Sequence, residues 1–108
     1  MSTAFVSQLR TARPPIVISP KPETGITIRV EIAELWETVR VVADADSTVT
    51  DVKQRVVMEF FPEHGFLDEF VLKLRGWEVL DERQSLTAAG ITDGSILLLA
   101  YRRRRPVK

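Results

Sequence analysis

The stretch TVRVVADADSTVTDVKQRVV, residues 38–57, contains the change of pattern that decides the fold. Its first residues alternate between apolar and polar, with Val39 and Val41 on one face, which is typical of a half-buried β-strand. Its second half predicts a helix that begins after Thr48, because threonine is a good N-cap and Asp51 three residues later completes a capping-box pattern. The stretch therefore predicts a strand followed directly by a helix.

The expected helix has one apolar face and a clear end. Apolar residues recur on it at helical spacing: Val49, Val52, Val56 and Phe60. Pro62 and Gly65 should stop it, because proline lacks the N–H that would continue the ladder and glycine favours the conformation that ends a helix. Such a helix is stable only when its apolar face packs against another element.

Further strands are predicted on both sides of this stretch. ITIRVEIA (26–33) alternates strictly and is separated from the strand at 38–44 by a short turn, so the two should form an antiparallel hairpin. Downstream, FVLKLRG (70–76) predicts a third strand, EVLD (78–81) a short fourth strand, and SILLLAY (95–101) the last one. This order of elements predicts an α+β domain whose helix covers one face of the sheet.

The length of 108 residues supports one domain, which we place at residues 25–102. Residues 1–24 should form a disordered, proline-rich arm, because proline fixes φ and withholds a backbone donor. Within it, the apolar IVIS (16–19) could alternatively pair as a strand on an edge. Residues 103–108 form a basic C-terminal tail.

The spaced residues in these segments resemble those of the ubiquitin-like (β-grasp) family over about residues 26–102. Residues 38–57 resemble its second strand and helix, with matches at Thr48, Val49, Val52 and Lys53. LKLRGWEVLDERQSLTAAGITDGSILLLAYR (72–102) resembles its later half, including a glycine after the third strand, a leucine that plugs the core and an aliphatic pair: Gly76, Leu80, Leu86 and Ile91. One-residue insertions fall near the second strand and near Val79. The resemblance implies a mixed sheet of four to five strands with one main helix packed across it.

The end of the chain departs from the conjugated members of this family. They finish in a di-glycine whose carboxylate is activated, because glycine alone fits the narrow channel of the activating enzymes. This sequence ends in YRRRRPVK (101–108), with Pro106 where flexibility is needed. We therefore expect a member that is not conjugated through its C-terminus, and the same departure argues against a sulfur carrier. The small ubiquitin-like accessory proteins of bacterial type VII secretion are similar in size and also lack the di-glycine.

The family resemblance also implies a recognition surface on the exposed face of the sheet. The centre of that surface corresponds to Lys73, with Leu98 and Ala100 on the last strand. A lysine at the centre argues against binding to general ubiquitin receptors. Exposed aromatic and arginine side chains are favoured at interfaces, so Arg75, Trp77 and Trp36 complete the expected partner-binding set. Either tryptophan could instead fold onto the edge of its own domain.

The net charge of zero hides an uneven distribution. Residues 26–101 carry seven basic and fourteen acidic side chains, a net −7, whereas the seven residues after them carry five basic ones. The arginines Arg102, Arg103, Arg104 and Arg105 could steer a protein partner, contact an anionic surface weakly, or only keep the sheet edge soluble. Specific nucleic-acid binding is not expected, because the acidic body opposes it.

Enzyme and metal chemistry find little support in the sequence. VRVVADADST (39–48) resembles the nucleophile motif of haloacid-dehalogenase-type phosphatases, but the magnesium-binding acidic pair those enzymes need has no strand leading into it. We expect Asp46 to make a turn and Thr48 to cap the helix. His64 is the only histidine, and the chain has no cysteine, so no metal site and no cofactor are expected. The acidic residues Asp68, Glu69, Glu78, Asp81 and Glu82 should form a solvated face.

These observations lead to one prediction of function: a non-catalytic ubiquitin-like adaptor that binds a protein partner. The absence of cysteine, of a secretory signal and of a long apolar run favours a cytoplasmic location without a transmembrane segment. The alternatives are a modifier that needs unusual processing, an accessory protein of a bacterial secretion system and, remotely, a small Asp-based phosphatase.

Overall fold

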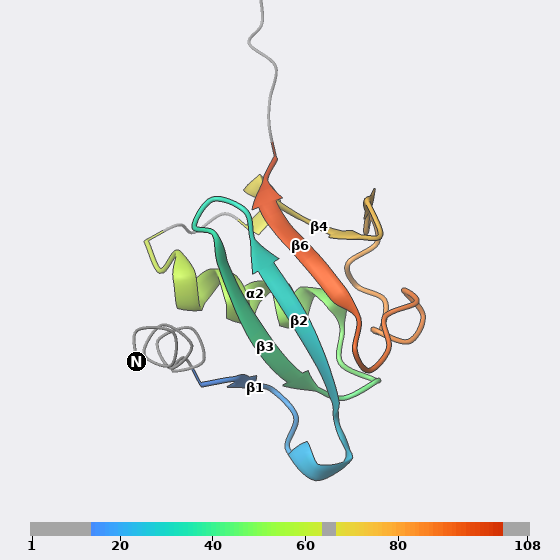
Figure 1. Ribbon diagram of the computed structural model, residues 1–108. Coiled ribbons are helices and arrows are strands. Elements are labelled where there is room, and N and C mark those ends of the chain that lie inside the picture. The colour runs from blue at the N-terminus through green and yellow to red at the C-terminus, as the bar shows by residue number, and fades with distance from the viewer. Residues whose placement is uncertain (1–13, 64–66, 103–108) are drawn as a thin grey trace, which may run out of the picture.

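The computed structural model describes residues 14–63 and 67–102 as one mixed β-sheet with a single long helix across it (Figure 1). In chain order the strands are β1 (Ile16–Val17), β2 (Ile26–Ile32), β3 (Glu37–Ala43), β4 (Phe70–Leu74), β5 (Trp77–Glu78) and β6 (Ile96–Tyr101). The helix is α2 (Val49–Phe60), and two short 3-10 turns, η1 (Pro22–Thr24) and η2 (Leu67–Glu69), connect elements. The predicted α+β class, with a mixed sheet and one main helix, is confirmed.

The sheet has the strand order β1-β3-β2-β6-β4-β5, which places the last strand near its middle. β6 runs parallel to β2, with Val30 opposite Leu97, and antiparallel to β4, with Leu72 opposite Leu99. β2 and β3 form the predicted antiparallel hairpin. A strand paired on both sides loses its solvent contact along both edges, which explains why so apolar a segment lies at the end of the domain.

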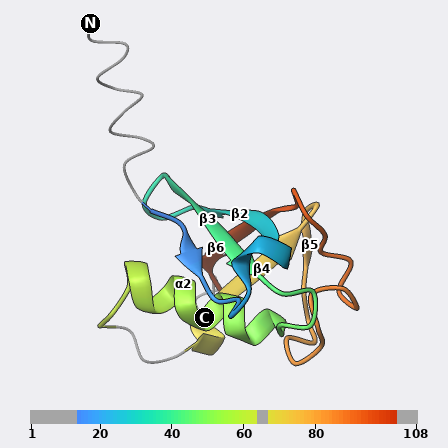
Figure 2. The same ribbon diagram turned by 90° about the horizontal axis from the view of Figure 1, so that it is seen from below.

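The helix begins as its sequence predicts. The N–H of Asp51 donates to Thr48 Oγ1 and the N–H of Thr48 donates to Asp51 Oδ2, each at 3.1 Å, which completes the capping box. Its buried side chains face the sheet, and Figures 1 and 2 show α2 lying across that one face. The helix and the sheet enclose the core between them. No helix in the described part of the chain is long and apolar enough to cross a membrane.

The structure corrects part of the expected N-terminal arm. Ile16 and Val17 form β1, which pairs in parallel with β3, and the N–H of Ile18 donates to the carbonyl of Val42 at 2.8 Å. Ile16 is buried against the core, so the apolar IVIS segment extends the sheet to six strands instead of belonging to a disordered arm. The rest of the predicted arm, residues 1–13, lies outside the described residues, and the exact domain limits stay a prediction.

The predicted role of Leu80 as a core residue is wrong. The short strand covers Trp77–Glu78, not residues 78–81, and the N–H of Val79 donates to the carbonyl of Leu72 at 2.8 Å. Because neighbouring side chains on an extended chain point in opposite directions, Val79 turns inward and Leu80 outward. Val79 is accordingly buried, whereas Leu80 is 82% exposed.

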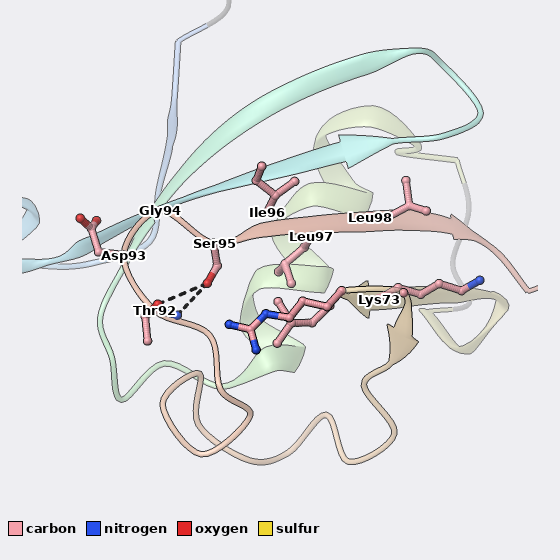
Figure 3. Close-up of a pocket in the computed structure, with 11 residues that line it drawn as sticks. Lys73, Thr92, Asp93, Gly94, Ser95, Ile96, Leu97 and Leu98 are labelled. Carbon is pink, nitrogen blue, oxygen red and sulfur yellow. Dashed lines mark hydrogen bonds between the residues drawn. The ribbon is translucent and has the colours of Figure 1, made fainter.

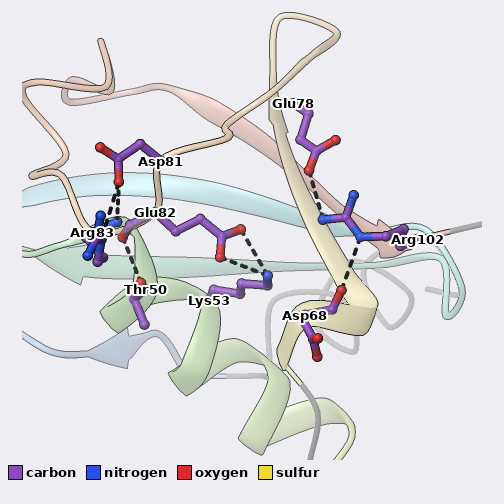
Figure 4. Close-up of polar contacts among 8 residues, drawn as sticks. All are labelled: Thr50, Lys53, Asp68, Glu78, Asp81, Glu82, Arg83 and Arg102. Atoms are coloured by element: carbon purple, nitrogen blue, oxygen red, sulfur yellow. Dashed lines mark hydrogen bonds and ion pairs between the residues drawn. The ribbon is translucent and has the colours of Figure 1, made fainter.

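A buried ion pair joins the helix to the segment that follows β5. Lys53 is only 1% exposed, and its Nζ lies 3.0 and 2.9 Å from the two carboxylate oxygens of Glu82 (Figure 4). The carbonyl of Glu82 also accepts from Thr50, from the N–H at 2.8 Å and from Oγ1 at 2.7 Å. Glu82 is therefore a structural partner and not a member of the solvated acidic face that we expected.

Two other acids of the expected solvated face also have partners. Glu78 accepts from Arg102, and Asp81 lies 3.9 Å from the Nε of Arg83 at the surface. The surface pair between Asp81 and Arg83 should contribute little to stability, because exposed ion pairs are screened by solvent.

The buried pair yields a test of how the fold is held together. Glu82→Ala leaves the Lys53 ammonium buried without its carboxylate, so the free energy of unfolding should fall by about 3 kcal/mol. Chemical denaturation measures this change. Asp81→Ala is the matched control, because its carboxylate is exposed, and its effect should stay within about 0.5 kcal/mol. Equal effects of the two variants would show that the Lys53–Glu82 pair does not stabilise the fold.

Candidate protein interface on the open sheet face

The face of the sheet opposite α2 is the candidate site, and we call it the open face. Side chains alternate along each strand, so every second residue points away from the core. Across the four central strands the outward residues are Thr27, Arg29, Glu31, Thr38, Arg40, Val42, Val71, Lys73, Ile96, Leu98 and Ala100. A sheet with one face packed and one face exposed is normally polar outside, so apolar residues in this set need a reason.

Leu98 lies at the centre of the open face. It is directly opposite Lys73 on β4 and Glu31 on β2, and Glu31 is in turn opposite Thr38 on β3. This row of four side chains crosses four strands. Leu98 also lines two shallow hollows of the surface, one toward β4 and one toward the β2–β3 turn. A partly buried leucine between two hollows is a suitable contact for an apolar group of a partner.

The first hollow, of about 560 Å³, lies between the end of β4 and the start of β6 (Figure 3). Lys73 and Arg75 line it together with the loop that leads into β6. That loop is held in shape because the N–H of Thr92 donates to Ser95 Oγ at 2.9 Å. The first hollow is therefore lined by a hydrogen-bonded loop on one side and by basic residues on the other.

The second hollow, of about 410 Å³, lies beside the turn between β2 and β3 and is lined by Trp36 and Leu98. Trp36 is 97% exposed and its φ is +55°, a left-handed conformation that a bulky residue adopts only at a cost. Neither its side-chain packing nor its backbone conformation helps the fold. Backbone outliers of this kind gather at functional positions, and this one belongs to a hollow of the open face.

The structure brings some of the predicted partner-binding residues together and separates another. Lys73, Leu98 and Ala100 share the open face, and Arg75 lies at the rim of the first hollow, with a φ of +55° in the β4–β5 turn. Trp77 does not join them. It pairs with Leu74, whose side chain packs against the core, and residues paired in this way point to the same side of the sheet.

Trp77 instead belongs to a third hollow, of about 390 Å³, at the β5 edge, which Leu80 also lines. It is 80% exposed, so neither tryptophan folds onto its own domain. The side chains of Trp77 and Leu80 form a separate apolar edge.

Three further residues of the open face were not part of the predicted partner-binding set: Arg29, Arg40 and Ile96. Arg29 is opposite both Arg40 and Ile96, so the three form one row across β3, β2 and β6. Ile96 is 48% exposed. The strict alternation of ITIRVEIA puts Arg29 on the face opposite the buried isoleucines and valine, and the pairing of β2 with β3 brings Arg40 beside it.

The C-terminal arginines were predicted to act as an electrostatic tail, and the first of them is bound to the domain. The N–H of Arg102 donates to the carbonyl of Glu69 at 2.6 Å, and its Nε donates to the carbonyl of Asp68 at 3.1 Å (Figure 4). Its Nη2 lies 2.9 Å from Glu78 Oε2. Arg103, Arg104 and Arg105 lie outside the described residues.

The aspartates of the phosphatase-like motif have local structural roles. Ser19 Oγ donates to Asp44 Oδ1 at 2.5 Å, and the N–H of Asp44 donates to Ser47 Oγ at 3.2 Å. Thr48 caps the helix. Within residues 14–63 and 67–102, no three His, Cys, Asp or Glu side chains are grouped so as to hold a metal ion. His64 lies outside the described residues.

Comparisons with known proteins identify the fold alone. No family model matches the sequence, and no curated protein matches it. The ubiquitin-like domain of Arabidopsis thaliana protein At2g32350 is similar in structure, with a TM-score of 0.61 and 21% identity, over 78% of this chain and 84% of that one. Caldiarchaeum subterraneum ubiquitin gives a TM-score of 0.62 and 19% identity, over 76% and 99%. The N-terminal ubiquitin-like domain of the 4931431F19Rik protein gives 0.59 and 20%, over 91% and 90%. The predicted ubiquitin-like β-grasp fold is confirmed.

The exposure and backbone of Trp36 yield a stability test. Trp36→Asn should keep the free energy of unfolding or raise it by up to about 1 kcal/mol, because asparagine tolerates the left-handed conformation far better. Chemical denaturation of the wild type and the variant measures the difference. A loss of more than about 1 kcal/mol would show that the tryptophan packs on its own domain and is not free for a partner.

Proposed function

We propose that this protein is a non-catalytic interaction module with a ubiquitin-like fold, which binds a protein partner through the open face. The observation that carries the proposal is the position of Leu98, at the centre of an uncovered sheet face and between two hollows. Ile96 and Trp36 add exposed apolar surface to the same region. A core of apolar contacts surrounded by polar and charged side chains is the usual composition of a protein interface.

The different roles of the two faces of the sheet support this proposal. On β6, Leu97 and Leu99 are completely buried and fill the core, so the fold is already supplied with apolar area from this strand. The alternate residues Ile96 and Leu98 make no contribution of that kind, because they point to the opposite side. A partner that covers Ile96 and Leu98 would be stabilised by the burial of their aliphatic side chains.

We further propose that the protein is not conjugated through its C-terminus. A modifier needs a free, flexible tail from the end of the last strand, whereas here three hydrogen bonds fix Arg102 against η2 and β5. Further basic residues follow Arg102 in the stretch RRRPVK. The proposed role of these basic residues is electrostatic steering toward a partner, as an adaptor working in the cytoplasm would use them.

A modifier made competent by unusual processing is the alternative within the same fold. It would require the Arg102 contacts to open and a new C-terminus to be exposed. Formation of an adenylate on the C-terminal carboxylate with ATP and an activating enzyme would favour it over the adaptor.

The adaptor proposal is tested by a comparison of captured partners. Tagged wild type, Leu98→Asp and Met58→Asp are used to capture proteins from an extract of the native cell. Met58 is the matched control, because it is also apolar and exposed but lies on the helix, away from the open face. We expect the wild type and Met58→Asp to retain the same partners and Leu98→Asp to lose them, because a polar carboxylate in place of the leucine removes the central apolar contact and is costly to desolvate there.

Identical partners for all three proteins would contradict the proposed face. A parallel Trp77→Ser variant shows whether the β5 edge is used as well. Circular dichroism and denaturation of each variant must match the wild type, so that a lost partner is not the result of unfolding.

A further inference from the structure

The basic side chains of the domain are unevenly paired. Among residues 26–102, Lys53, Arg83 and Arg102 each have a carboxylate partner. The remaining basic residues of this range have no hydrogen bond or ion pair from their side chains in the described structure: Arg29, Arg40, Arg55, Lys73 and Arg75. All of these except Arg55, which is on α2, lie on the open face or at its rim. The unpaired cations are therefore gathered on one surface.

Two of these cations oppose each other in the sheet. Arg29 and Arg40 are directly cross-strand neighbours, and neither is paired with an acid. Side chains in such positions lie about 5 Å apart at their Cβ atoms, and like charges there destabilise the pair of strands. This repulsion is unfavourable for folding. We therefore expect an anionic group of a binding partner to lie between the two guanidinium groups.

Three acids line the open face or its two hollows: Glu31, Glu37 and Asp93. Glu31 is the one acidic residue among the outward strand positions, and it is opposite Leu98 and Thr38. Asp93, at the rim of the first hollow, uses Oδ1 to accept the N–H of Thr27 at 2.8 Å. Most of the fourteen acids of residues 26–101 lie elsewhere, so a basic surface is set on an acidic body.

The cations flank the apolar line on β6. Ile96 and Leu98 are about 6.8 Å apart along the strand, and neighbouring strands are about 4.8 Å apart. Arg29 and Arg40 lie one and two strands away on one side, and Lys73 lies one strand away on the other. A ligand about the width of a helix would therefore meet aliphatic groups along its middle and positive charge along both sides.

We propose that the open face binds an acidic segment of a partner protein, with aliphatic side chains on Ile96 and Leu98 and carboxylates on the cations at both sides. Arg29 and Arg40 hold one carboxylate between them, and Lys73 receives another on the β4 side of Leu98. This inference rests on the proposed function and adds the chemistry of the partner to it.

A protein segment fits this surface better than a nucleic acid or an anionic membrane does. Both of those are extended polyanions, and the net charge of −7 over residues 26–101 repels them beyond the few side chains in contact. A short acidic segment carries its charges close to the four cations and nowhere else on the domain. At these distances, below the Debye length of about 8 Å, salt screens the attraction only in part. The exposed aliphatic groups at the centre can pack against the apolar side chains of a peptide, whereas a phosphate backbone offers no apolar contact.

The test uses a synthetic helical peptide of about 15 residues, with leucines spaced by four and glutamates on both sides of that stripe. A second peptide has glutamine at every glutamate position. Binding to the full-length protein is measured by isothermal titration calorimetry and by amide shifts in nitrogen-15-labelled protein, at about 50 and about 200 mM salt. The protein variants are Arg29→Gln/Arg40→Gln, Leu98→Asp and, as the matched control, Arg55→Gln on the helix.

We expect the acidic peptide to bind more tightly than the glutamine peptide and to shift amides of β2, β3 and β6. The Arg29→Gln/Arg40→Gln variant should raise its Kd by about tenfold, and higher salt should also raise it, whereas Arg55→Gln should change it less than about twofold. Amide spectra show whether each variant is folded. If the double variant unfolds, Lys73→Gln replaces it and should weaken binding in the same sense.

The outcomes that contradict the inference are distinct from those that contradict the proposed function. No binding of the acidic peptide, or equal binding of both peptides, would overturn the inference. Partner capture that depends on Leu98 but not on Arg29 and Arg40 would overturn it and leave the proposed function standing. Tighter binding of a single-stranded oligonucleotide, or of phosphatidylcholine–phosphatidylserine vesicles, through the same arginines would assign the face to a polyanion instead.

Discussion

The pairing of β6 on both of its edges is the constraint on which the rest of the structure depends. By joining β2 in parallel and β4 in antiparallel orientation, the last strand unites the N-terminal hairpin and the later strands into one sheet. Its buried leucines, Leu97 and Leu99, then lie against α2, and the alternate side chains necessarily form the centre of the opposite face. The same alternation that closes the core therefore defines the candidate interface. A one-residue shift in this strand would exchange the two sets.

Local patterns in the sequence were sufficient to predict the elements, and long-range contacts explain the errors. Alternation predicted β2 and β3, short apolar runs predicted β4 and β6, and the capping box predicted the start of α2. The pairing of β1 with β3 and the inward turn of Val79 in place of Leu80 depend on strands that are distant in sequence. The partner of Lys53 was hidden for the same reason, because Glu82 is part of an irregular segment without a periodic pattern.

The positions of the candidate residues in the fold were predicted in part, and the unusual features of the open face lie where the sequence departs from the usual rules of folding. The resemblance to the ubiquitin-like family suggested that Lys73, Leu98 and Ala100 share a face, and the pairing of β4 with β6 brings them together there. The Arg29–Arg40 contact could not be recognised from either strand alone. A bulky residue at positive φ, two arginines opposite each other and an exposed isoleucine all occur on this face or at its edge. Proteins accept such local conflicts at functional sites.

The central claim is that the open face is arranged for a partner at some cost to the stability of the fold. The most direct measurement is the free energy of unfolding of Arg40→Glu, which converts the like-charged pair with Arg29 into an oppositely charged one while leaving the core untouched. The account predicts that this variant is more stable than the wild type, by roughly 0.5 kcal/mol at low salt, with the difference reduced at high salt. A variant less stable than the wild type would contradict the account, because the two arginines would then be supporting the fold itself.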